Sequence, residues 1–238
     1  MGRTLGRYTL IGVLTLVACS FGMGAARADI ISDTGSIDLL SSPPASLRLG
    51  ELTSSADIYV FEERSDVKLP KKVAVDITSA GTYESRDSLT PGLIKKNTLV
   101  DSYMLHVDPS GLRESHEYNG SITFNTPILG LVVLSNHLTK TDAFLGAPGT
   151  IYPTGQRHRV LNLGPKDYVT LSSNLETLTV HLGTKGSMDE IRIVTAADPV
   201  VMPLTAALVP EPNTLVIAGS MLLLLPLLGR LSRRRAFR

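Results

Sequence analysis

The fold class is decided by the stretch Asn119-Gly120-Ser121-Ile122-Thr123-Phe124 and by the apolar run from Ile128 to Leu134 that follows it. Ile122 and Phe124 alternate with polar residues, which is the pattern of a strand with one buried face. The nearly continuous apolar run predicts a central strand buried on both faces. Asn119-Gly120 has the composition of a type I′ turn, so residues 113–118 are expected to pair with residues 121–126 as a hairpin.

The same alternation recurs on both sides of this stretch. Further strands are predicted at residues 72–78, 98–107, 160–163, 169–171, 177–182 and 190–195. Eleven prolines between residues 29 and 208 cut the chain into short pieces and leave little room for long helices. About ten strands at this spacing predict an all-β fold, an antiparallel β-sandwich of jelly-roll type, with a closed barrel as the main alternative.

Charge is distributed unevenly over the 238 residues, because eight of the 23 Lys and Arg residues are arginines near the two ends. Residues 29–208 hold 15 Lys and Arg against 21 Asp and Glu, a net charge of −6 with histidine neutral. An acidic body with scattered cations is poorly suited to binding phosphates, so no nucleic-acid partner is expected. Cys19 lies outside this body, which excludes a disulfide, a cysteine metal site or a thiol nucleophile there.

The first 28 residues have the pattern of a secretory signal peptide. Two arginines precede an apolar stretch, and Ala26-Arg27-Ala28 forms a small-x-small cleavage site for signal peptidase. We expect cleavage after Ala28. Leu16-Val17-Ala18-Cys19 also resembles the lipobox of bacterial lipoproteins, in which the cysteine is acylated, so lipoprotein processing at Cys19 is the alternative.

The most specific pattern is at the C-terminus, where Val209-Pro210-Glu211-Pro212 precedes an uncharged stretch at residues 213–229. Seventeen residues span about 25 Å as a helix, which is the short limit for crossing a membrane. An arginine-rich tail, residues 230–238, follows and would hold the end of the chain in the cytoplasm, leaving the acidic body outside. Its first basic residues are Arg230, Arg233, Arg234 and Arg235. A plain single-span anchor is the simpler alternative.

Residues 209–235 resemble the PEP-CTERM sorting signal of Gram-negative bacteria in the order of their parts. The resemblance implies that an exosortase, a membrane-embedded transpeptidase, recognises Pro210-Glu211-Pro212 and removes the tail. It further implies that the body passes from the inner membrane to the cell surface or the extracellular matrix. Pro226 late in the span and residues 236–238 beyond the arginines depart from the family's pattern.

The chain is thereby divided into a signal peptide (1–28), a β-sandwich ectodomain (29–195), a linker (196–208) and the sorting signal (209–235), with one terminal helix expected at each end. Several segments between Gly120 and Thr195 resemble uncharacterised ectodomains that precede PEP-CTERM signals. That resemblance implies a fold and no activity.

No catalytic residue, metal site or cofactor is predicted, because the chain has no Gly-x-Ser-x-Gly, His-Glu-x-x-His or phosphate-binding loop. The histidines are scattered, and His181 is expected on a solvated strand face. Three polar clusters could contact a cation or a sugar hydroxyl, although each is more simply a turn or a solvated edge. They are Glu62-Glu63 with Asp66, Asp108-Pro109-Ser110-Gly111 and His116-Glu117. The basic patch Gln156-Arg157-His158-Arg159 could instead meet an acidic polysaccharide, with a charged strand entrance as the simpler alternative.

Asp189 and Arg192 lie three apart on a strand and are expected on opposite faces, which argues against one shared site. The favoured function is an exported surface or matrix protein whose body binds or helps to build an exopolysaccharide. A glycan-active secreted enzyme and a plain membrane-tethered domain are the alternatives. A binding module would expose aromatic residues on one face, for which the candidates are Tyr59, Tyr83, Tyr118 and Tyr152.

Overall fold

The computed structural model describes residues 29–111, 115–153, 159, 161–164, 166–184 and 186–197. The predicted signal peptide and the sorting signal lie outside these residues. Among the described residues, no helix is both long enough and apolar enough to cross a membrane. The elements are β1 (Ile30–Gly35), β2 (Ile37–Leu39), β3 (Ile58–Lys68), β4 (Val73–Val75), β5 (Gly81–Tyr83), η1 (Arg86–Ser88), β6 (Gly92–Ile94), β7 (Leu99–Val107), β8 (His116–Phe124), β9 (Ile128–Val132), α1 (Ser135–Leu145), β10 (Tyr168–Leu171), β11 (Thr177–Thr184) and β12 (Asp189–Ala196).

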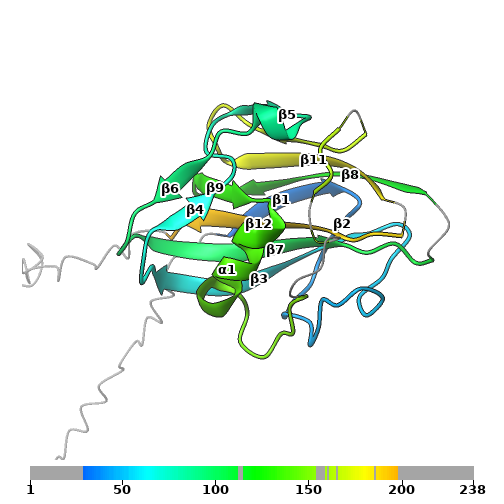
Figure 1. Ribbon diagram of the computed structural model, residues 1–238, viewed down its shortest axis with the longest axis horizontal. Helices are drawn as coiled ribbons and strands as arrows, with labels where there is room; N and C mark the ends of the chain where they lie inside the picture. Colours follow the sequence, from blue (N-terminus) through cyan, green and yellow to red (C-terminus); the bar gives the residue numbers. More distant parts are fainter. Residues whose placement is uncertain are drawn as a thin grey trace, which may run out of the picture.

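Two five-stranded sheets face each other (Figure 1). The first sheet has the order β1-β8-β11-β10-β5, and the second has the order β2-β3-β7-β12-β9. Neighbouring strands are antiparallel except β2 and β3, which run parallel. The all-β prediction is confirmed, as are the strands predicted near residues 98–107, 169–171, 177–182 and 190–195.

The main core lies between the two sheets. Alternate residues of β7 and β12, such as Leu105 and Ile193, meet alternate residues of β8 and β11, such as Phe124 and Val180. The Tyr103 ring packs on the Phe124 ring with their centroids 4.9 Å apart. The period-two alternation in the sequence therefore correctly predicts which residues of these strands face the core between the sheets.

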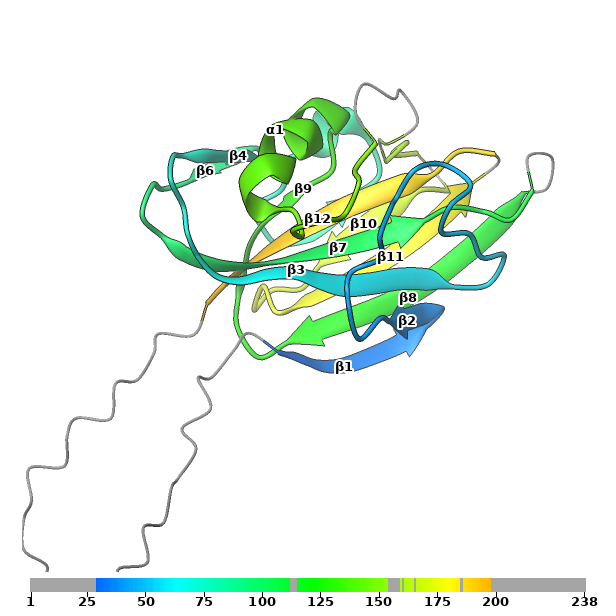
Figure 2. The ribbon, with the colours of Figure 1, turned by 90° about the horizontal axis from the view of Figure 1, so that it is seen from below.

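A third layer covers the other face of the second sheet. Figure 2 shows α1, β4 and β6 on one side of β7 and β12, with β8 and β11 on the opposite side. Leu138 and Leu145 of α1 pack there with Val73 of β4, Met104 of β7 and Val194 of β12. The second sheet is consequently buried on both faces, and β7 and β12 have hardly any exposed position.

The helix α1, of 11 residues, is an element that the sequence analysis did not predict. Leu138, Thr141 and Leu145 recur at helical spacing and form the buried stripe of α1. The helix begins directly after the predicted apolar run, whose strand ends at Val132 rather than at Leu134.

The hairpin predicted around Asn119-Gly120 is wrong, because β8 runs straight through both residues. It pairs with β11 along one edge and with β1 along the other. The turn lies instead at Gly35, whose φ of 72° is left-handed, and Ser36 N donates to Asn119 O at 2.7 Å. A Cβ on Gly120 would lie 2.7 Å from Ile37 Cγ1, so glycine is required there by the close approach of β2.

Two other strand predictions need correction. β9 is buried as expected, but it is an edge strand of the second sheet. Its outer edge is occupied by the β4 extension, since Asp76 N donates to Leu131 O at 2.8 Å and Leu131 N donates to Ile77 O at 2.9 Å. Residues 161–163 form no strand.

The two ends of the described body leave it on the same side. Asp29 N donates to Asn125 Oδ1 at 2.9 Å, and Ala196 N donates to Pro127 O at 2.9 Å, so both ends adjoin the β8–β9 loop. All the paired strands and all the residues of both hydrophobic clusters lie between residues 29 and 197. This body therefore carries its own core.

Candidate functional site

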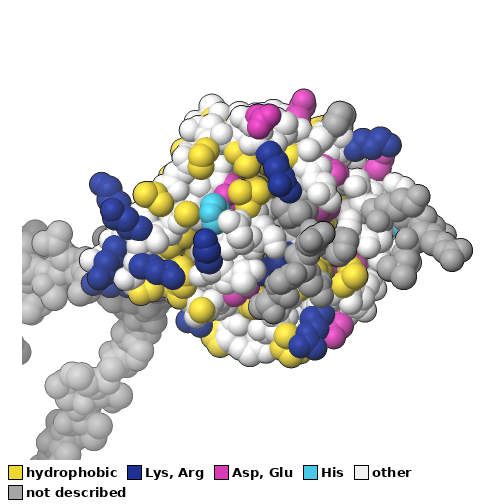
Figure 3. Space-filling view, viewed as in Figure 1, with side chains coloured by type: hydrophobic (Ala, Val, Ile, Leu, Met, Phe, Trp, Pro, Cys, Tyr) yellow, Lys and Arg dark blue, Asp and Glu magenta, His cyan; other side chains and the backbone are white. Residues whose placement is uncertain are grey.

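A shallow basic hollow lies between β4 and the outer side of α1, in the face shown in Figure 3. Its volume is about 170 Å³. The residues that line it are Lys71, Lys72, Val73, Ala74, His137, Lys140, Thr141 and Phe144. Cations and apolar side chains thus share its wall, and no carboxylate is among the lining residues.

The wall of the hollow is held by a buried carboxylate. Asp76 Oδ1 lies 2.6 Å from His137 Nδ1, and Asp76 Oδ2 accepts hydrogen bonds from the N–H groups of Val133 and Leu134 at 2.8 and 2.9 Å. These bonds fix the chain where it turns from β9 into α1. Lys71 Nζ lies 5.0 Å from the centre of the Phe144 ring, a cation–π distance.

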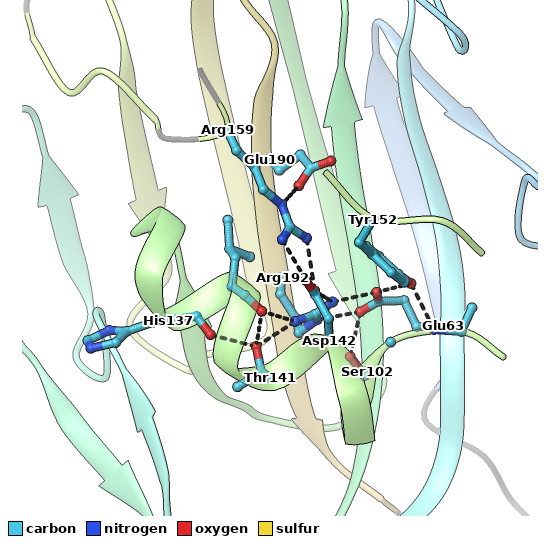
Figure 4. Close-up of polar contacts among 12 residues, drawn as sticks. Glu63, Ser102, His137, Thr141, Asp142, Tyr152, Arg159, Glu190 and Arg192 are labelled. Carbon is cyan, nitrogen blue, oxygen red and sulfur yellow. Dashed lines mark hydrogen bonds and ion pairs between the residues drawn. The ribbon is translucent and has the colours of Figure 1, made fainter. Parts of the chain in front are cut away.

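Beneath α1, on the inner side of the same layer, two arginines and three carboxylates form a buried network (Figure 4). Arg192 of β12 binds Glu63 of β3 through two parallel bonds, Nε to Oε2 at 2.6 Å and Nη2 to Oε1 at 2.8 Å. Both side chains are fully buried. This bidentate geometry gives the strongest form of guanidinium–carboxylate pair.

Arg192 also ties the sheet to the helix above it. Its Nη1 donates to Leu138 O at 3.1 Å and to Thr141 Oγ1 at 2.5 Å, and its Nη2 donates to Asp142 Oδ1 at 2.9 Å. Burial by itself lowers the pKa of Arg192, but the adjacent carboxylates of Glu63 and Asp142 outweigh burial and raise it. The guanidinium therefore stays charged.

Arg159 makes the second half of the network from the segment after α1. Its Nη1 and Nη2 donate to the two oxygens of Asp142 at 2.6 and 2.9 Å, and its Nε bonds to Glu190 of β12. The other oxygen of Glu190 lies 3.2 Å from His106 Nδ1 on β7. Asp142 is shared between both arginines and is the most exposed member of the ion pairs, at 13%.

Tyr152 closes the network from the side. Its hydroxyl donates to Glu63 Oε1 at 2.6 Å and accepts from Ala147 N at 2.7 Å. Its ring lies beside both guanidinium groups, with centroid distances of 5.4 Å to Arg159 and 5.5 Å to Arg192. Burial, followed by the negative charge of Glu63, raises the pKa of Tyr152.

The network is suited to holding elements together. Its carboxylates are occupied by guanidinium, hydroxyl or imidazole groups, and its two arginines, Glu63 and Glu190 are closed from solvent, while Asp142 is 13% exposed. An acid–base pair would need a carboxylate within reach of a substrate. The charges instead clamp α1 and the segment around Tyr152 to β3 and β12, which fixes the outer surface that carries the basic hollow.

A second hollow of about 460 Å³ lies at the opposite end of the sandwich, between the loop at Leu49-Gly50 and residues 108–111. Asp108 is buried there and accepts a bond from Gly50 N at 2.5 Å. Burial raises the pKa of Asp108, and it raises the pKa of the nearby Asp189 well above the ordinary value. In the part of the chain that the structure describes, no group of three or more His, Cys, Asp or Glu side chains could hold a metal ion.

The polar clusters predicted from sequence take unexpected positions. Glu63 is a buried partner of Arg192 and not a solvated edge residue, so it does not join Glu62 and Asp66 in a cation site. Arg159 is fully buried, which corrects the prediction of a basic surface patch at residues 156–159. Residues 156–158 lie outside the described residues.

The four candidate tyrosines do not form one exposed face. Tyr83 and Tyr118 are core residues, Tyr152 belongs to the network, and Tyr59 is half-buried on β3. His181 is half-buried, bonds to Asn119 and stacks on Tyr168 at 4.9 Å. Asp189 and Arg192 do lie on opposite faces of β12, since Arg192 points to α1 while Ile191 and Ile193 face the first sheet.

The sequence pattern did not reveal the buried network, although it predicted the strand that carries Glu190 and Arg192. Glu190 and Arg192 alternate with Ile191 and Ile193, which predicts a strand with one solvated face. The signal that could have found the buried charges is the helical spacing of Leu138, Thr141 and Leu145 directly after β9, because a helix there must cover one face of a sheet.

Comparison with protein-family models, with curated proteins and with solved structures finds no match to this chain.

Proposed function

We propose that this chain is an exported bacterial surface or extracellular-matrix protein, processed by signal peptidase after Ala28 and by an exosortase at Val209-Pro210-Glu211-Pro212. Residues 213–229 hold it in the inner membrane until then, with the arginines from Arg230 onward on the cytoplasmic side. The body serves as a polysaccharide-associated binding or structural module. The observation that carries the proposal is the order of the terminal segments around an acidic body.

The fold supports this division of the chain. β1 begins at Ile30, so cleavage after Ala28 would leave the first sheet intact. β12 ends at Ala196, which leaves a stretch rich in Ala, Val and Pro before Val209. Both ends of the body lie beside the β8–β9 loop, so a tail in the membrane would leave the far end of the sandwich directed away from it.

The closed charge network supports a non-catalytic role for the body. Its ion pairs position α1 and carry no group that a substrate could reach easily. We retain the jelly-roll type as the proposed class of the sandwich, because the chain crosses repeatedly between the two sheets from β7 to β12.

The test is the intact mass of the protein recovered from membrane and extracellular fractions of a Gram-negative host that carries an exosortase. Two variants are compared with the natural chain. One replaces Pro210, Glu211 and Pro212 by Ala. The matched control replaces Pro199 and Pro203 of the linker by Ala, which also removes prolines but leaves the motif untouched.

We expect a species that begins at Asp29, ends near residue 210 and reaches the extracellular fraction from the natural chain and the linker control only. A mass that runs through to Arg238 in all three proteins would refute exosortase processing and leave a plain anchor. A lipid-sized increase on Cys19 would refute cleavage after Ala28.

A further inference from the structure

Six of the eight lysines of the chain gather on one part of the outer layer, although the body as a whole is acidic. We name this part the lysine face. It consists of Lys68, Lys71, Lys72, Lys95, Lys96 and Lys140, all exposed. In Figure 3 several dark blue side chains lie beside hydrophobic ones at the left of the view, where Figure 1 places β4 and β6.

Backbone pairing brings these lysines together from separate segments. Leu69 N donates to Thr98 O at 3.0 Å, and Asn97 N donates to Leu69 O at 2.9 Å, which joins the β3–β4 loop to the turn after β6. Val73 pairs with Ile94, so Lys72 and Lys95 stand next to that pair on adjacent strands. Lys71, Lys72 and Lys140 are neighbours around the basic hollow.

The lysine face adjoins the point where the chain leaves the body toward its C-terminus. Ala197 N donates to Leu99 O, and Leu99 in turn pairs with Lys68 of β3. Two strand spacings of roughly 4.8 Å thus separate the exit of the chain from the first lysine of the face. Only 15 residues lie between Ala197 and the start of the uncharged stretch at Asn213.

An apolar side chain stands among the cations. Leu93 is 64% exposed, more than the other exposed large hydrophobic residues of the described chain. It pairs with Ala74, which lines the basic hollow, so Leu93 projects from the same face as the hollow. Of the carboxylates nearby, Asp76 and Asp101 are buried, whereas Asp66 remains exposed at the margin.

We propose that the lysine face docks the body on the anionic phospholipid headgroups of the membrane that holds its tail, with Leu93 entering the interface. The orientation toward a membrane rests on the proposed function of the tail. Clustered lysines attract anionic lipid surfaces, each contributing about 1 kcal/mol near the surface. An exposed leucine beside them adds apolar contact, as in proteins that bind at the interface.

The position of the face favours a membrane over an acidic polysaccharide. The face lies where the chain leaves the body, and its most exposed apolar side chain is Leu93, whereas the Phe144 ring is half-buried with Lys71 Nζ 5.0 Å from its centre. A dissolved polyanion can reach any face of the body, so its binding would not require a site at the end from which the tail departs.

The experiment uses the body, residues 29–208, which carries both hydrophobic clusters within itself. Its sedimentation with phosphatidylcholine vesicles is compared with its sedimentation with vesicles containing 30% phosphatidylglycerol. One variant combines Lys71→Gln, Lys72→Gln and Lys95→Gln. The matched control removes the same charge elsewhere with Arg48→Gln, Arg86→Gln and Lys166→Gln, all exposed. A third variant is Leu93→Ser.

We expect binding to the anionic vesicles only, weakening as salt is raised. One kcal/mol corresponds to about fivefold in affinity, so the lysine variant should lose on the order of a hundredfold. The control triple should lose no more than a few-fold. Leu93→Ser should weaken binding several-fold while its salt dependence stays that of the natural body. Circular dichroism checks that each variant is folded.

Three results would overturn the proposal: equal binding to neutral and anionic vesicles, equal losses in the two triple variants, or no binding. It would also be overturned if a dissolved polyuronate bound the body as tightly as the anionic vesicles and with the same sensitivity to the lysine variant, since the face would then be a polysaccharide site. Because the body lacks the tail, this assay is independent of exosortase processing, so either proposal can fail alone.

Discussion

Arg192 donates five hydrogen bonds from its guanidinium to oxygens of two other elements, β3 and α1. A buried guanidinium is tolerated only when hydrogen bonds and opposite charges compensate for its loss of hydration. Loss of the guanidinium would leave the buried carboxylate of Glu63 without a cationic partner, which is the costly situation for a buried ion pair.

We therefore predict that Arg192→Leu lowers the free energy of unfolding by about 3–5 kcal/mol, measured by urea denaturation. Arg192→Lys should also be destabilising, because an ammonium cannot reproduce the two parallel bonds to Glu63. Arg86→Leu, at an exposed position, is the matched control and should change stability by less than about 0.5 kcal/mol. Equal effects at both positions would contradict a role of the network in stability.

Asp189 gives the fold a dependence on pH. Burial, reinforced by Asp167 and Glu190, raises its pKa well above 3.8, and its Oδ1 has no hydrogen-bond partner. Between the ordinary and the raised pKa, the folded chain holds a proton that the unfolded chain has released. Folding then takes up a proton, so stability due to this group is full below the ordinary pKa and falls as pH rises through the raised one.

Replacement of Asp189 by Asn removes this loss, because the amide has no proton to release in that range. We predict that Asp189→Asn gains stability relative to the natural body as the pH is raised from about 4 to about 8, with urea midpoints as the measurement. Asp33→Asn on the exposed strand β1 controls for the loss of one carboxylate. Parallel pH profiles of Asp189→Asn and the natural body would disprove the assignment.

Among the elements, β8 illustrates how a local turn signal is overridden. Asn119-Gly120 favours a tight turn in isolation, yet both residues are strand positions with neighbours on each side. The glycine serves a different purpose there, since it leaves space for Ile37 of β2 and for the carbonyl oxygen of Thr34.

Gly120→Ala should accordingly destabilise the body by about 1–3 kcal/mol, the usual range for overpacking. The added Cβ would lie 2.7 Å from Ile37 Cγ1 and 2.8 Å from Thr34 O, and the backbone contact cannot relax easily. Gly164→Ala is the control, because the nearest atom to its added Cβ is 3.7 Å away. Thermal or urea unfolding that ranks the two variants equally would show that β2 tolerates displacement.

The strands could be predicted from sequence because one face of each obeys the simple alternation of buried and polar residues. Val180 and Leu182 of β11 are examples, with His181 between them only half-buried. The second sheet breaks this rule, since its polar alternates such as Arg192 are covered by α1. Their burial depends on contacts with Asp142 and Glu63, 50 and 129 residues away, which no local pattern reveals.

The candidate site was missed for the same reason. The lysines of the hollow come from the β3–β4 loop and from α1, and they become neighbours only through the third layer. The basic patch expected at residues 156–159 was chosen because its charges are adjacent in sequence. Arg159 turns inward instead, because Asp142 and Glu190 offer it buried partners.

At the scale of the whole molecule, three layers are closed around two hydrophobic clusters, and the chain enters and leaves beside residues 125–127. The all-β class followed from composition and spacing, whereas the third layer and the meeting of the two ends did not. Because the two ends of the body lie close together, they could be joined by a short linker and the chain opened elsewhere, as a circular permutant.

We predict that a circular permutant folds when Ala197 is joined to Asp29 and new ends are opened between the exposed residues Ser41 and Ser42. A Gly/Ser linker of about eight residues has a mean end-to-end distance of roughly 15 Å and should suffice. The permutant should keep the circular dichroism spectrum and one cooperative unfolding transition. The same linker with new ends between Tyr103 and Met104, inside β7, is expected to abolish folding. Loss of folding in both would contradict the proximity of the ends.

β12, the strand that leads to the tail, lies between β7 and β9 and pairs with β7 along its full length, from Asp189 to Ala196. A pull on the tail runs along this strand and loads its hydrogen bonds in shear, all together. An edge strand pulled from its end would peel away one bond at a time. Under the proposed function, tension on the C-terminal segment would thus enter the body through a central strand that is paired along both edges.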